Sequence, residues 1–286
     1  MNDGTKTFAS GRRVAIQGVR GAFHELAARR AFAGEEIEIV CASTFEELVE
    51  LVEKGERADA GLMAIENTLA GSIMDNYRLL QERNLGICGE VYLHIEQNLM
   101  ALPGVKIEDL REVHSHPMAL AQCRAFFEQH PHIKLVESQD TAYSARLLSE
   151  EKNPERGAIA SVLAADLYGL EVIAAGIETH KQNHTRFLSL LPFGKCPKNS
   201  EADKVSISFA LPHRTGSLHG VLAVLSAYQC NLTKIQSAPI VGQPWEYLFF
   251  IDFIRQGVQD IQQALDAIRP VTHGLRVLGI YESSVE

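Results

Sequence analysis

The feature that most constrains the fold is an alternation of short apolar runs with helical apolar spacings over the first two thirds of the chain. Val14–Ile16, Ile37–Val40 and Leu62–Ile65 are short apolar runs and strand candidates. Between the last two, the pattern from Thr44 to Lys54 predicts a helix capped by Ser43 or Thr44. Strands that alternate with helices indicate an α/β fold of parallel sheets covered by helices.

The same pattern continues toward residue 190. It predicts helices over Phe23–Ala31, Ser72–Leu80, Pro117–Phe127, Thr141–Ser149 and Ser161–Tyr168, and strands over Gly157–Ile159 and Val172–Ala174. Pro117 suits a first helical position, where its missing N–H costs nothing. Asp140 is expected to cap the helix that follows it.

The pattern breaks between Phe193 and Asp203, where proline, glycine, asparagine and serine are frequent, as in a linker. Beyond this linker the predicted elements are a strand over Val205–Leu211, a helix over Leu218–Leu225, strands over Leu232–Ile235 and Tyr247–Phe253, a helix over Val258–Ile268 and a strand over Leu275–Tyr281. This βαββαβ order in about 80 residues is ferredoxin-like. We therefore expect two domains, at 12–193 and 203–282.

Charge and hydropathy argue against two classes of partner. The formal net charge of −9 argues against nucleic acid, because proteins that bind this polyanion carry a basic patch or stripe. No apolar run reaches the roughly 18 residues that a membrane-spanning helix needs. The polar segment from Met1 to Arg13 lacks the apolar core of a secretory signal, so we expect a soluble cytoplasmic protein.

The cysteines and histidines indicate neither a disulfide framework nor a metal site. The five cysteines are odd in number and far apart, and none forms a Cys-x-x-Cys pair, which is typical of a reducing compartment. The pairs His114 with His116 and His130 with His132 fit surface or capping roles better than zinc ligation. The phosphate-loop, HExxH and GxSxG motifs are absent, and we expect no metal and no organic cofactor.

Two segments near predicted strand ends carry groups that chemistry could use. From Gly18 to Glu25, two glycines allow a tight turn and a helix start offers N–H groups to an anion, although a plain turn is the favoured reading. From Ile65 to Ser72, a carboxylate, an amide and hydroxyls follow a strand, at the edge where α/β sheets bind ligands. Loop ordering and helix capping are an equal alternative for this second segment.

Two later segments repeat this chemistry. Ser115-His116-Pro117 is either a second anion-binding helix start with a hydroxyl donor or an ordinary helix start. If Asn183 to Leu188 form a strand, Asn183, Thr185 and Phe187 share one face, with His184 and Arg186 on the other. An amide, a hydroxyl and an aromatic ring suit the wall of a polar pocket, while an edge strand with one polar side is the alternative.

Taken in order, these segments resemble the prephenate dehydratase family from about Val14 to Tyr281. The residues that carry the resemblance are Gly18 with Gly21-Ala22-Phe23, Ile65-Glu66-Asn67 with Gly71, Ser115-His116-Pro117 with Ala119-Leu120 and Gln122-Cys123, Asp140-Thr141-Ala142, Ala158-Ile159-Ala160 and, most specifically, Asn183-x-Thr185-Arg186-Phe187. The resemblance implies a bilobal catalytic domain like periplasmic binding proteins, with the site in the cleft. It also implies loss of CO₂ and water from prephenate to give phenylpyruvate for phenylalanine biosynthesis.

The C-terminal part resembles an ACT domain, the ferredoxin-like module that binds amino acids. Gly216-Ser217-Leu218-His219 resembles the family's Gly-Ala-Leu-His, and the run from Asn231 to Pro239 resembles Asn-Leu-Thr-Lys-Ile-Glu-Ser-Arg-Pro. The resemblance implies phenylalanine bound between ACT domains of a homodimer or homotetramer. The implied effector residues are Gly216, Ser217, Leu218, His219, Asn231, Leu232 and Ser237. Gln236 and Ala238 depart from the family's glutamate and arginine.

The resemblance and the donor chemistry together assign roles in the predicted catalytic site. Thr185 donates to the leaving hydroxyl, Asn67 and Ser115 add side-chain donors, and Phe187 walls the ring and keeps out water. Glu66 is a proton source only if burial raises its pKa, and loop ordering is the favoured alternative.

Substrate carboxylates are assigned to backbone N–H groups at the helix starts after Gly21, Gly71 and Pro117. Arg186 belongs to the predicted site segment although strand alternation points it to the other face. The predicted substrate-binding residues are Gly21, Ala22, Phe23, Thr68, Gly71, His116, Asn183 and Arg186.

Two other functions are compatible with parts of this pattern. Arogenate, which carries an amino group where prephenate has a keto group, could be the substrate of the same catalytic face. A non-catalytic amino-acid sensor could also combine a binding-protein fold with an ACT domain. The set Asn183, Thr185, Arg186 and Phe187 argues against the sensor, which has no need of it.

Overall fold

The structure is a computed structural model that describes residues 11–240, 246–256 and 260–284. Its contacts group the chain into two compact units. The first runs to Ser72 and includes Val91–Phe187, and the second comprises Ile73–Glu90 and the chain from Leu188 onward. Each unit is described by itself below.

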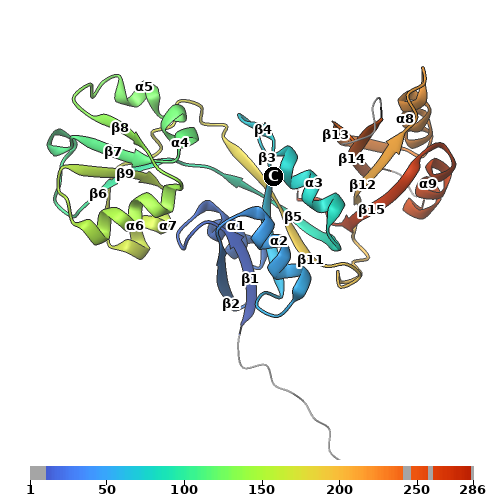
Figure 1. Cartoon of the computed structure of the whole chain (residues 1–286), viewed down its shortest axis with the longest axis horizontal. Helices are drawn as coiled ribbons and strands as arrows, with labels where there is room; N and C mark the ends of the chain where they lie inside the picture. The colour runs from blue at the N-terminus through green and yellow to red at the C-terminus, as the bar shows by residue number, and fades with distance from the viewer. Residues whose placement is uncertain (1–10, 241–245, 257–259, 285–286) are drawn as a thin grey trace, which may run out of the picture. The chain divides into compact units, whose positions relative to one another are not determined.

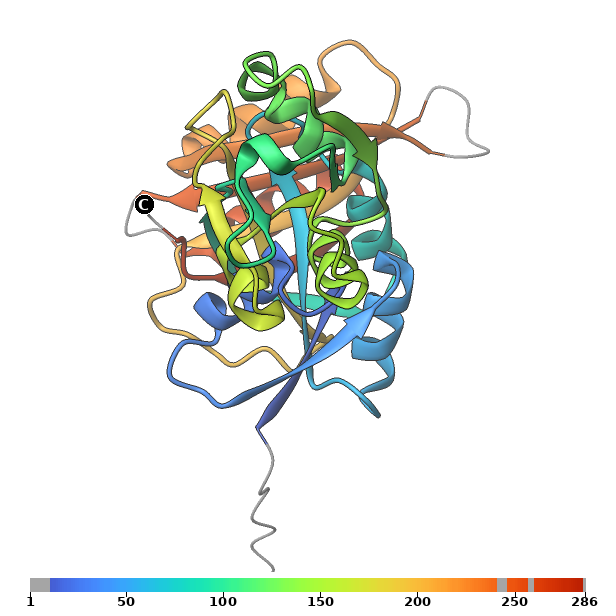
Figure 2. The same cartoon turned by 90° about the vertical axis from the view of Figure 1, so that its left-hand side faces the viewer.

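The first unit begins with a sheet built around β1, whose central residues Val14, Ala15 and Ile16 are fully buried, as expected for a strand covered on both faces. β1 pairs in parallel with β2 and with β3, and Figures 1 and 2 show these strands side by side. The elements are β1 (Arg12–Gln17), α1 (Phe23–Ala31), β2 (Ile37–Ala42), α2 (Phe45–Lys54), β3 (Ala60–Asn67) and β4 (Gly71–Ser72). The sheet order is β2-β1-β3-β11-β5, with β5 (Leu85–His94) and β11 (His184–Pro192).

A second sheet of the first unit has the order β10-β6-β9-β7-β8. Its elements are β6 (Asn98–Ala101), the 3₁₀ turn η1 (Ile107–Asp109), β7 (Glu112–Ser115), α4 (Pro117–Gln122), α5 (Arg124–Phe127), β8 (Lys134–Glu137), α6 (Thr141–Glu151), β9 (Arg156–Ala160), α7 (Val162–Tyr168) and β10 (Glu171–Ala174). Helices α6 and α7 cover one face and α4 and α5 the other (Figure 1). The unit therefore has two lobes, each an α/β sheet with its own helices.

The prediction of purely parallel sheets is wrong for this second sheet. β6 runs antiparallel to both of its neighbours, β9 and β10. β6 follows β5 of the first sheet directly, through Ile95–Gln97, and no helix lies between the two strands. It therefore runs in the opposite direction to a strand that follows a crossover helix.

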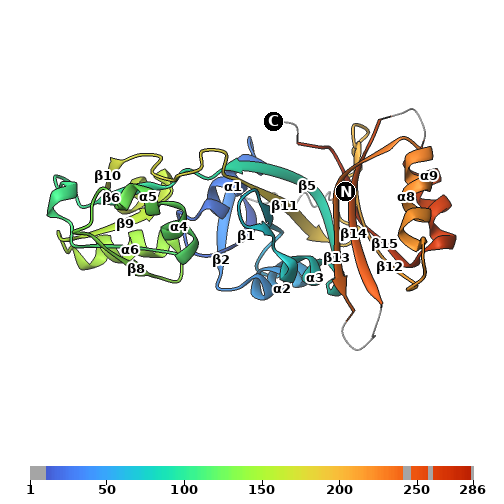
Figure 3. The same ribbon diagram turned by 90° about the horizontal axis from the view of Figure 1, so that it is seen from above.

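The second unit contains an antiparallel sheet of order β13-β14-β12-β15. Its elements are β12 (Lys204–Leu211), α8 (Ser217–Ala227), β13 (Cys230–Pro239), β14 (Tyr247–Arg255), α9 (Ile261–Ile268), the 3₁₀ turn η2 (Arg269–Val271) and β15 (His273–Tyr281). Helices α8 and α9 lie on one face, over a core that includes Phe209, Val221 and Phe253 (Figure 3). This is the predicted βαββαβ arrangement, although Val258 of the predicted helix lies outside the described residues.

The opposite face of this sheet carries α3 (Met74–Glu82), with the Tyr77 and Phe250 rings 5.0 Å apart. The fold class, an α/β two-lobed domain followed by a ferredoxin-like module, is confirmed. One predicted helix start is wrong, because Gly71 and Ser72 pair with Asn67 and Glu66 as a hairpin and the helix begins only at Met74.

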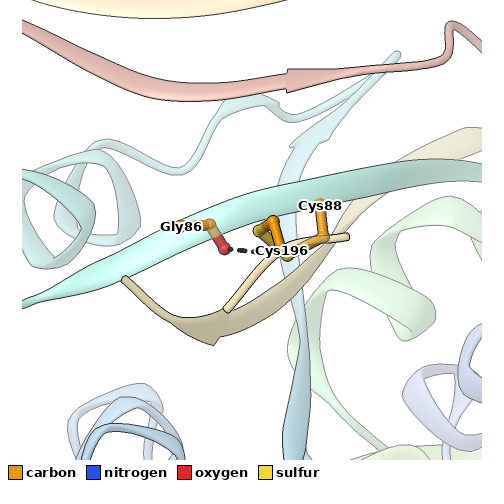
Figure 4. Close-up of a disulfide and its surroundings, with 3 residues drawn as sticks. All are labelled: Gly86, Cys88 and Cys196. Atoms are coloured by element: carbon orange, nitrogen blue, oxygen red, sulfur yellow. Dashed lines mark hydrogen bonds between the residues drawn. A yellow bond between two sulfur atoms is a disulfide. The ribbon is translucent and has the colours of Figure 1, made fainter. Parts of the chain in front are cut away.

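A disulfide joins Cys88 of β5 to Cys196, just beyond β11, with the two Cα atoms 5.2 Å apart (Figure 4). A side chain at Gly86 would press on the bridge, because its Cβ would lie 3.2 Å from Cys196 Sγ. The prediction of no disulfide is therefore wrong. Cys88 and Cys196 are 108 residues apart, but β5 and β11 are sheet neighbours, which a cysteine count cannot reveal.

Candidate active site

The Gly18–Phe23 turn of the first lobe depends on its glycines. Gly18 and Gly21 have φ values of +100° and +85°, which favour glycine. A Cβ on Gly21 would also lie 3.0 Å from Ala164 of the other lobe, and the Gly21 carbonyl accepts a hydrogen bond from Ser161 Oγ at 2.6 Å. The turn that carries the predicted residues Gly21, Ala22 and Phe23 is thus fixed against the second lobe. No side chain caps α1, so its first N–H groups suit an anion.

The fully buried Glu25 contacts the same turn through its carboxylate. It was not predicted as a site residue. Its carboxylate accepts hydrogen bonds from the Gly21 N–H at 2.8 Å, from Arg20 Nε at 3.0 Å and from Arg29 Nη2 at 2.6 Å. Burial alone would raise its pKa, but these donors together hold the pKa of Glu25 below its ordinary value. Glu25 therefore stays ionised and pins the turn.

Asp140 faces the same turn from the second lobe. It caps α6 as predicted, with Oδ1 accepting from the Tyr143 N–H at 2.9 Å, while Oδ2 would lie 3.1 Å from a Cβ on Gly18. Burial raises the pKa of Asp140, although the N–H groups of Tyr143 and Ala142 oppose the shift. The carboxyl group of Asp140, which is protonated more readily than an exposed aspartate, therefore lies beside the glycine turn.

Asn67, Asn183 and Thr185, which were predicted separately, contact one another. Asn67 Nδ2 donates to Asn183 Oδ1 at 2.8 Å and to Thr185 Oγ1 at 2.9 Å, across 116 and 118 residues of sequence. Asn67 Oδ1 accepts from the N–H groups of Leu69 and Ala70, both at 2.9 Å. Asn67 thus orders its own loop, as the alternative interpretation expected. It also orients the side chains of Thr185 on β11 and of Asn183, which precedes β11.

This contact makes the hydroxyl of Thr185 an acceptor toward Asn67. Its oxygen accepts the Asn67 amide, so the O–H hydrogen remains for another acceptor. Thr185 is 8% exposed, whereas Asn183 is completely buried. A buried, oriented hydroxyl of this kind can donate to an oxygen that gains charge during a reaction.

Two glutamines that were not predicted as site residues extend this cluster. Gln122 at the end of α4 accepts from Asn183 Nδ2 at 3.0 Å and from Gln97 Nε2 at 3.1 Å. The Gln97 N–H donates to the buried carboxylate of Glu178 at 2.9 Å. The amides thereby fix the orientation of Asn183, and they join the strand ends of one lobe to a helix of the other.

The predicted donor role of Ser115 disagrees with its geometry. Ser115 is completely buried and its Oγ donates to the Ile159 carbonyl at 2.7 Å. His116, which is exposed, caps α4 by accepting from the Met118 N–H at 3.2 Å, and Pro117 occupies the first turn. The segment therefore behaves as the ordinary helix start that was the alternative, with His116 rather than Ser115 facing outward.

Replacing Ser115 with alanine tests this geometry. We expect turnover within about fivefold of wild type, because the hydroxyl proton is already used by Ile159. Stability should fall by about 1–2 kcal/mol, since the Ile159 carbonyl loses its donor. Steady-state kinetics and urea unfolding of the same preparation measure both effects. A loss of turnover above about a hundredfold with little change in stability would restore Ser115 to the catalytic residues.

The remaining predicted residues hold the site together or lie at its margin. Thr68 is exposed and donates to the Gln182 carbonyl at 2.9 Å, so it ties its loop to the chain before β11. Gly71 has a φ of +81° and lies in the hairpin rather than at a helix start, which overturns its predicted N–H role. Glu66 is half-buried at the end of β3, and Arg186 is buried.

Phe187 is buried and packs against His24, with the rings edge to face and their centroids 5.0 Å apart. His24 also contacts the Phe45 ring at 5.6 Å. Burial lowers the pKa of His24 to about 4, so the imidazole is neutral at physiological pH. His24 thus packs in one aromatic cluster with Phe45 and Phe187.

Acid sensitivity should follow from the His24 environment. Its pKa of about 4 in the folded chain lies below the ordinary 6.5, so neutral His24 stabilises the fold above pH 6.5 and this stability is lost as the pH falls through 4. His24→Phe should remove this loss. Between pH 7.5 and pH 4.5 the wild type should lose about 2–3 kcal/mol more than the variant, measured by urea unfolding. Equal losses in both proteins would contradict the assignment.

The predicted effector residues divide into two groups on the second unit. Gly216, with a φ of +82°, precedes α8, whose first turn holds Ser217, Leu218 and His219. Ser217 and Leu218 line a small pocket of about 120 Å³ with Tyr247 and Phe249. Asn231, Leu232 and Ser237 lie on the edge strand β13, with Asn231 at the end far from Tyr247.

Comparison with known proteins decides the family. The family model for prephenate dehydratase matches residues 14–192. The chain belongs to the prephenate dehydratase family. It is 40% identical over 281 residues to arogenate dehydratase/prephenate dehydratase 2 of Arabidopsis thaliana, a chloroplastic protein, covering 94% of this chain and 72% of that one.

Solved structures of similar proteins span the whole chain. The prephenate dehydratase of Arthrobacter aurescens, solved in complex with L-phenylalanine, superposes with a TM-score of 0.84 at 29% identity, covering 95% of this chain and 90% of that one. A protein described as a quorum-quenching acylase, GqqA, superposes with a TM-score of 0.86 at 31% identity, covering 96% and 98%. The likeness therefore includes the C-terminal module as well as the family domain.

The described residues contain neither a candidate membrane span nor a candidate metal site. No helix among them is long and apolar enough to cross a membrane. Within the same ranges, no group of three or more histidine, cysteine, aspartate or glutamate side chains could hold a metal ion. The cytoplasmic location stays a prediction.

Proposed function

We propose that this chain catalyses the decarboxylating dehydration of prephenate to phenylpyruvate, as a carbon–oxygen lyase that needs no cofactor. The observation that carries the proposal is the Asn67–Asn183–Thr185 cluster, in which the Thr185 hydroxyl is oriented with its hydrogen available. Membership of the prephenate dehydratase family supports the same reaction. The catalytic domain would be residues 12–193 and the regulatory domain residues 203–282.

The reaction requires little thermodynamic help, because the product gains an aromatic ring. The bond from the ring to its carboxylate breaks and releases CO₂, and its electron pair enters the ring as the C–O bond to the hydroxyl breaks. The departing oxygen leaves with a pair of electrons and takes a proton to become water. The enzyme must therefore hold two carboxylates and stabilise an oxygen that becomes negative.

Thr185 is assigned to the departing oxygen. Because the Thr185 oxygen accepts from the Asn67 amide, its O–H can donate directly or through one water. A threonine hydroxyl is a weak acid, so hydrogen bonding to the developing charge contributes more than complete proton transfer. The rest of the cluster keeps this hydroxyl in one orientation before the substrate arrives.

The substrate carboxylates are assigned to backbone donors. The first turn of α1, after the fixed Gly18–Gly21 turn, offers uncapped N–H groups on one lobe. On the other lobe, the predicted donor position after Pro117 does not stand, because Pro117 has no N–H and the Met118 N–H donates to His116 at 3.2 Å. Water exclusion by the lobes would weaken the solvation of the ring carboxylate and favour loss of CO₂.

Arogenate is the second candidate substrate, because the Arabidopsis relative carries both activities in its name. The two substrates differ only in the side-chain amino or keto group, which none of the assigned donors contacts specifically. Paired assays that compare kcat/KM for prephenate and arogenate test the proposal. A kcat/KM for prephenate above that for arogenate supports it, and turnover of arogenate alone would replace it with the second candidate.

We also propose that phenylalanine inhibits the enzyme through a homodimer or homotetramer, joined in pairs along β13. Gly216–His219 lie at one end of β13 and Asn231 at the other, about 25 Å of strand away at 3.3 Å per residue. A second copy paired antiparallel along this edge would bring its Asn231 and Leu232 beside Gly216–His219 of the first. One effector site would then need both chains, consistent with the L-phenylalanine bound in the Arthrobacter relative.

A further inference from the structure

A second pocket lies on the face of the C-terminal sheet opposite to α8 and α9. It has a volume of about 440 Å³, in the range typical of small-molecule sites, and belongs entirely to the second unit. Its apolar lining consists of Met74, Ala238, Pro239, Ile240, Leu248 and Phe250, and its polar lining of Asp75, Arg78, Gln81 and Glu82. One wall is therefore the sheet, and the other is the polar side of α3.

Specific contacts hold the two walls of the pocket in place. Ser208 Oγ donates to Gln81 Oε1 at 2.5 Å, and Arg276 donates to the carbonyls of Gln81 and Arg83, each at 2.5 Å. Burial lowers the pKa of Arg276. The Tyr77 ring of α3 also packs on the Phe250 ring of β14. Ser208 engages the side-chain oxygen of Gln81, and the charged groups that line the pocket are Asp75, Arg78 and Glu82.

These three charges lie on one side of α3, at spacings of three and four residues. Arg78 contacts Glu82 at 3.5 Å, and both side chains are more than half exposed, so the pair is weak and can open toward a ligand. The charges alternate negative, positive, negative along the helix. This pattern complements a molecule with a carboxylate and an ammonium group close together.

Ala238 explains why the pocket is open in this chain. The family motif that the segment from Asn231 to Pro239 resembles has arginine at this position, and Ala238 lines the pocket. An arginine side chain here would extend into the space that Ala238 leaves empty. The departure in the ACT motif is therefore also the change that makes room for a ligand.

We propose that this pocket binds an α-amino acid with a large apolar side chain. The ligand's side chain packs on Leu248 and Phe250. Its carboxylate pairs with Arg78, and its ammonium group pairs with Asp75 or Glu82. The site is distinct from the predicted effector residues. Leu248 and Phe250 point from β14 to the α3 face, whereas Phe249, which lines the pocket of Ser217 and Leu218, points to the α8 face. The inference goes beyond the proposed function and does not require catalysis.

Isothermal titration of the full chain with L-phenylalanine, L-tyrosine and L-tryptophan tests the proposal. Ala238→Arg should weaken binding at this site by at least about tenfold by filling it, and Arg78→Gln should do the same by removing the carboxylate partner. Arg269→Gln is the matched control. Arg269 is as exposed as Arg78 and has a comparable weak pair with Asp266, but it lies on η2, so binding should be unchanged.

Further arms separate this site from the effector site. Asn231→Ala should leave binding at the pocket intact, and 3-phenylpropionate or phenethylamine, which lack the ammonium or the carboxylate, should bind at least about tenfold more weakly than phenylalanine. Ala238→Met serves as a second filling variant, and thermal melts confirm that each variant is folded. The proposal would be overturned if Ala238→Arg bound the amino acid as wild type does, or if binding were lost only in Asn231→Ala. It would also be overturned if no saturable binding were seen, or if either analogue bound as tightly as phenylalanine.

Discussion

Replacing Thr185 with alanine should lower kcat for prephenate by about 10²–10³-fold, the usual cost of removing one preorganised donor to a developing oxyanion. The Asn67 amide would lose one acceptor at the same time, but it keeps Asn183 and the His184 carbonyl. The fold should therefore survive, and KM should change much less than kcat. Steady-state assays of phenylpyruvate formation, read by its absorbance in alkali, measure both constants.

Two variants control this prediction. Thr185→Ser keeps the hydroxyl and should retain kcat within about tenfold of wild type. Thr272→Ala removes another largely buried threonine hydroxyl, one that donates to the Ile268 carbonyl at 2.9 Å in the C-terminal module, and should leave kcat unchanged. Wild-type turnover in folded Thr185→Ala would remove Thr185 from the mechanism.

Replacing Lys204 with methionine should destabilise the protein by about 3–5 kcal/mol, because it leaves the Glu90 carboxylate buried without its cation. Lys204 Nζ donates to both carboxylate oxygens of Glu90 at 2.8 Å, and the side chains are 3% and 0% exposed. The Ser284 N–H also donates to this carboxylate, at 3.1 Å, but a backbone hydrogen bond does not replace an ammonium group. Urea unfolding gives the change in free energy.

The double variant Lys204→Met/Glu90→Leu separates the loss of a contact from the cost of a buried carboxylate that has lost the Lys204 ammonium group. Replacing both partners by apolar groups of similar volume should restore most of the stability, to within about 2 kcal/mol of wild type. If the single variant costs less than about 1 kcal/mol, the pair is not buried as described. If the double variant is as unstable as the single one, the buried carboxylate of Glu90 is not the cause.

The elements that local signals define could be predicted from the sequence. Thr44 caps α2 by accepting the Glu47 N–H, Asp140 caps α6, and the five apolar residues Val205, Ile207, Phe209, Ile251 and Phe253 are buried as their alternation predicted. The short strands Asn98–Ala101 and Lys134–Glu137 were not predicted, because four residues are too few to show an alternation. The same brevity hid the reversal of β6 that makes the second sheet mixed.

The site could be predicted only motif by motif. Asn67, Asn183 and Thr185 were each selected for their chemistry, and the structure brings them into contact. Gln122 was noticed only as part of a motif, and its role depends on a contact 61 residues away that no local pattern encodes. Ser115 was selected for a hydroxyl that a neighbouring strand's carbonyl uses, and the partner of Cys88 is visible only once β5 and β11 are neighbours.

The most direct test of the central claim is the conversion of prephenate by the purified full-length chain at neutral pH, with phenylpyruvate measured by its absorbance in alkali. The account predicts phenylpyruvate formation that depends on enzyme concentration, needs no added metal or cofactor and is suppressed by L-phenylalanine. Formation without suppression would keep the catalytic assignment and reject the phenylalanine control. No formation from prephenate above the uncatalysed rate would contradict the proposed reaction.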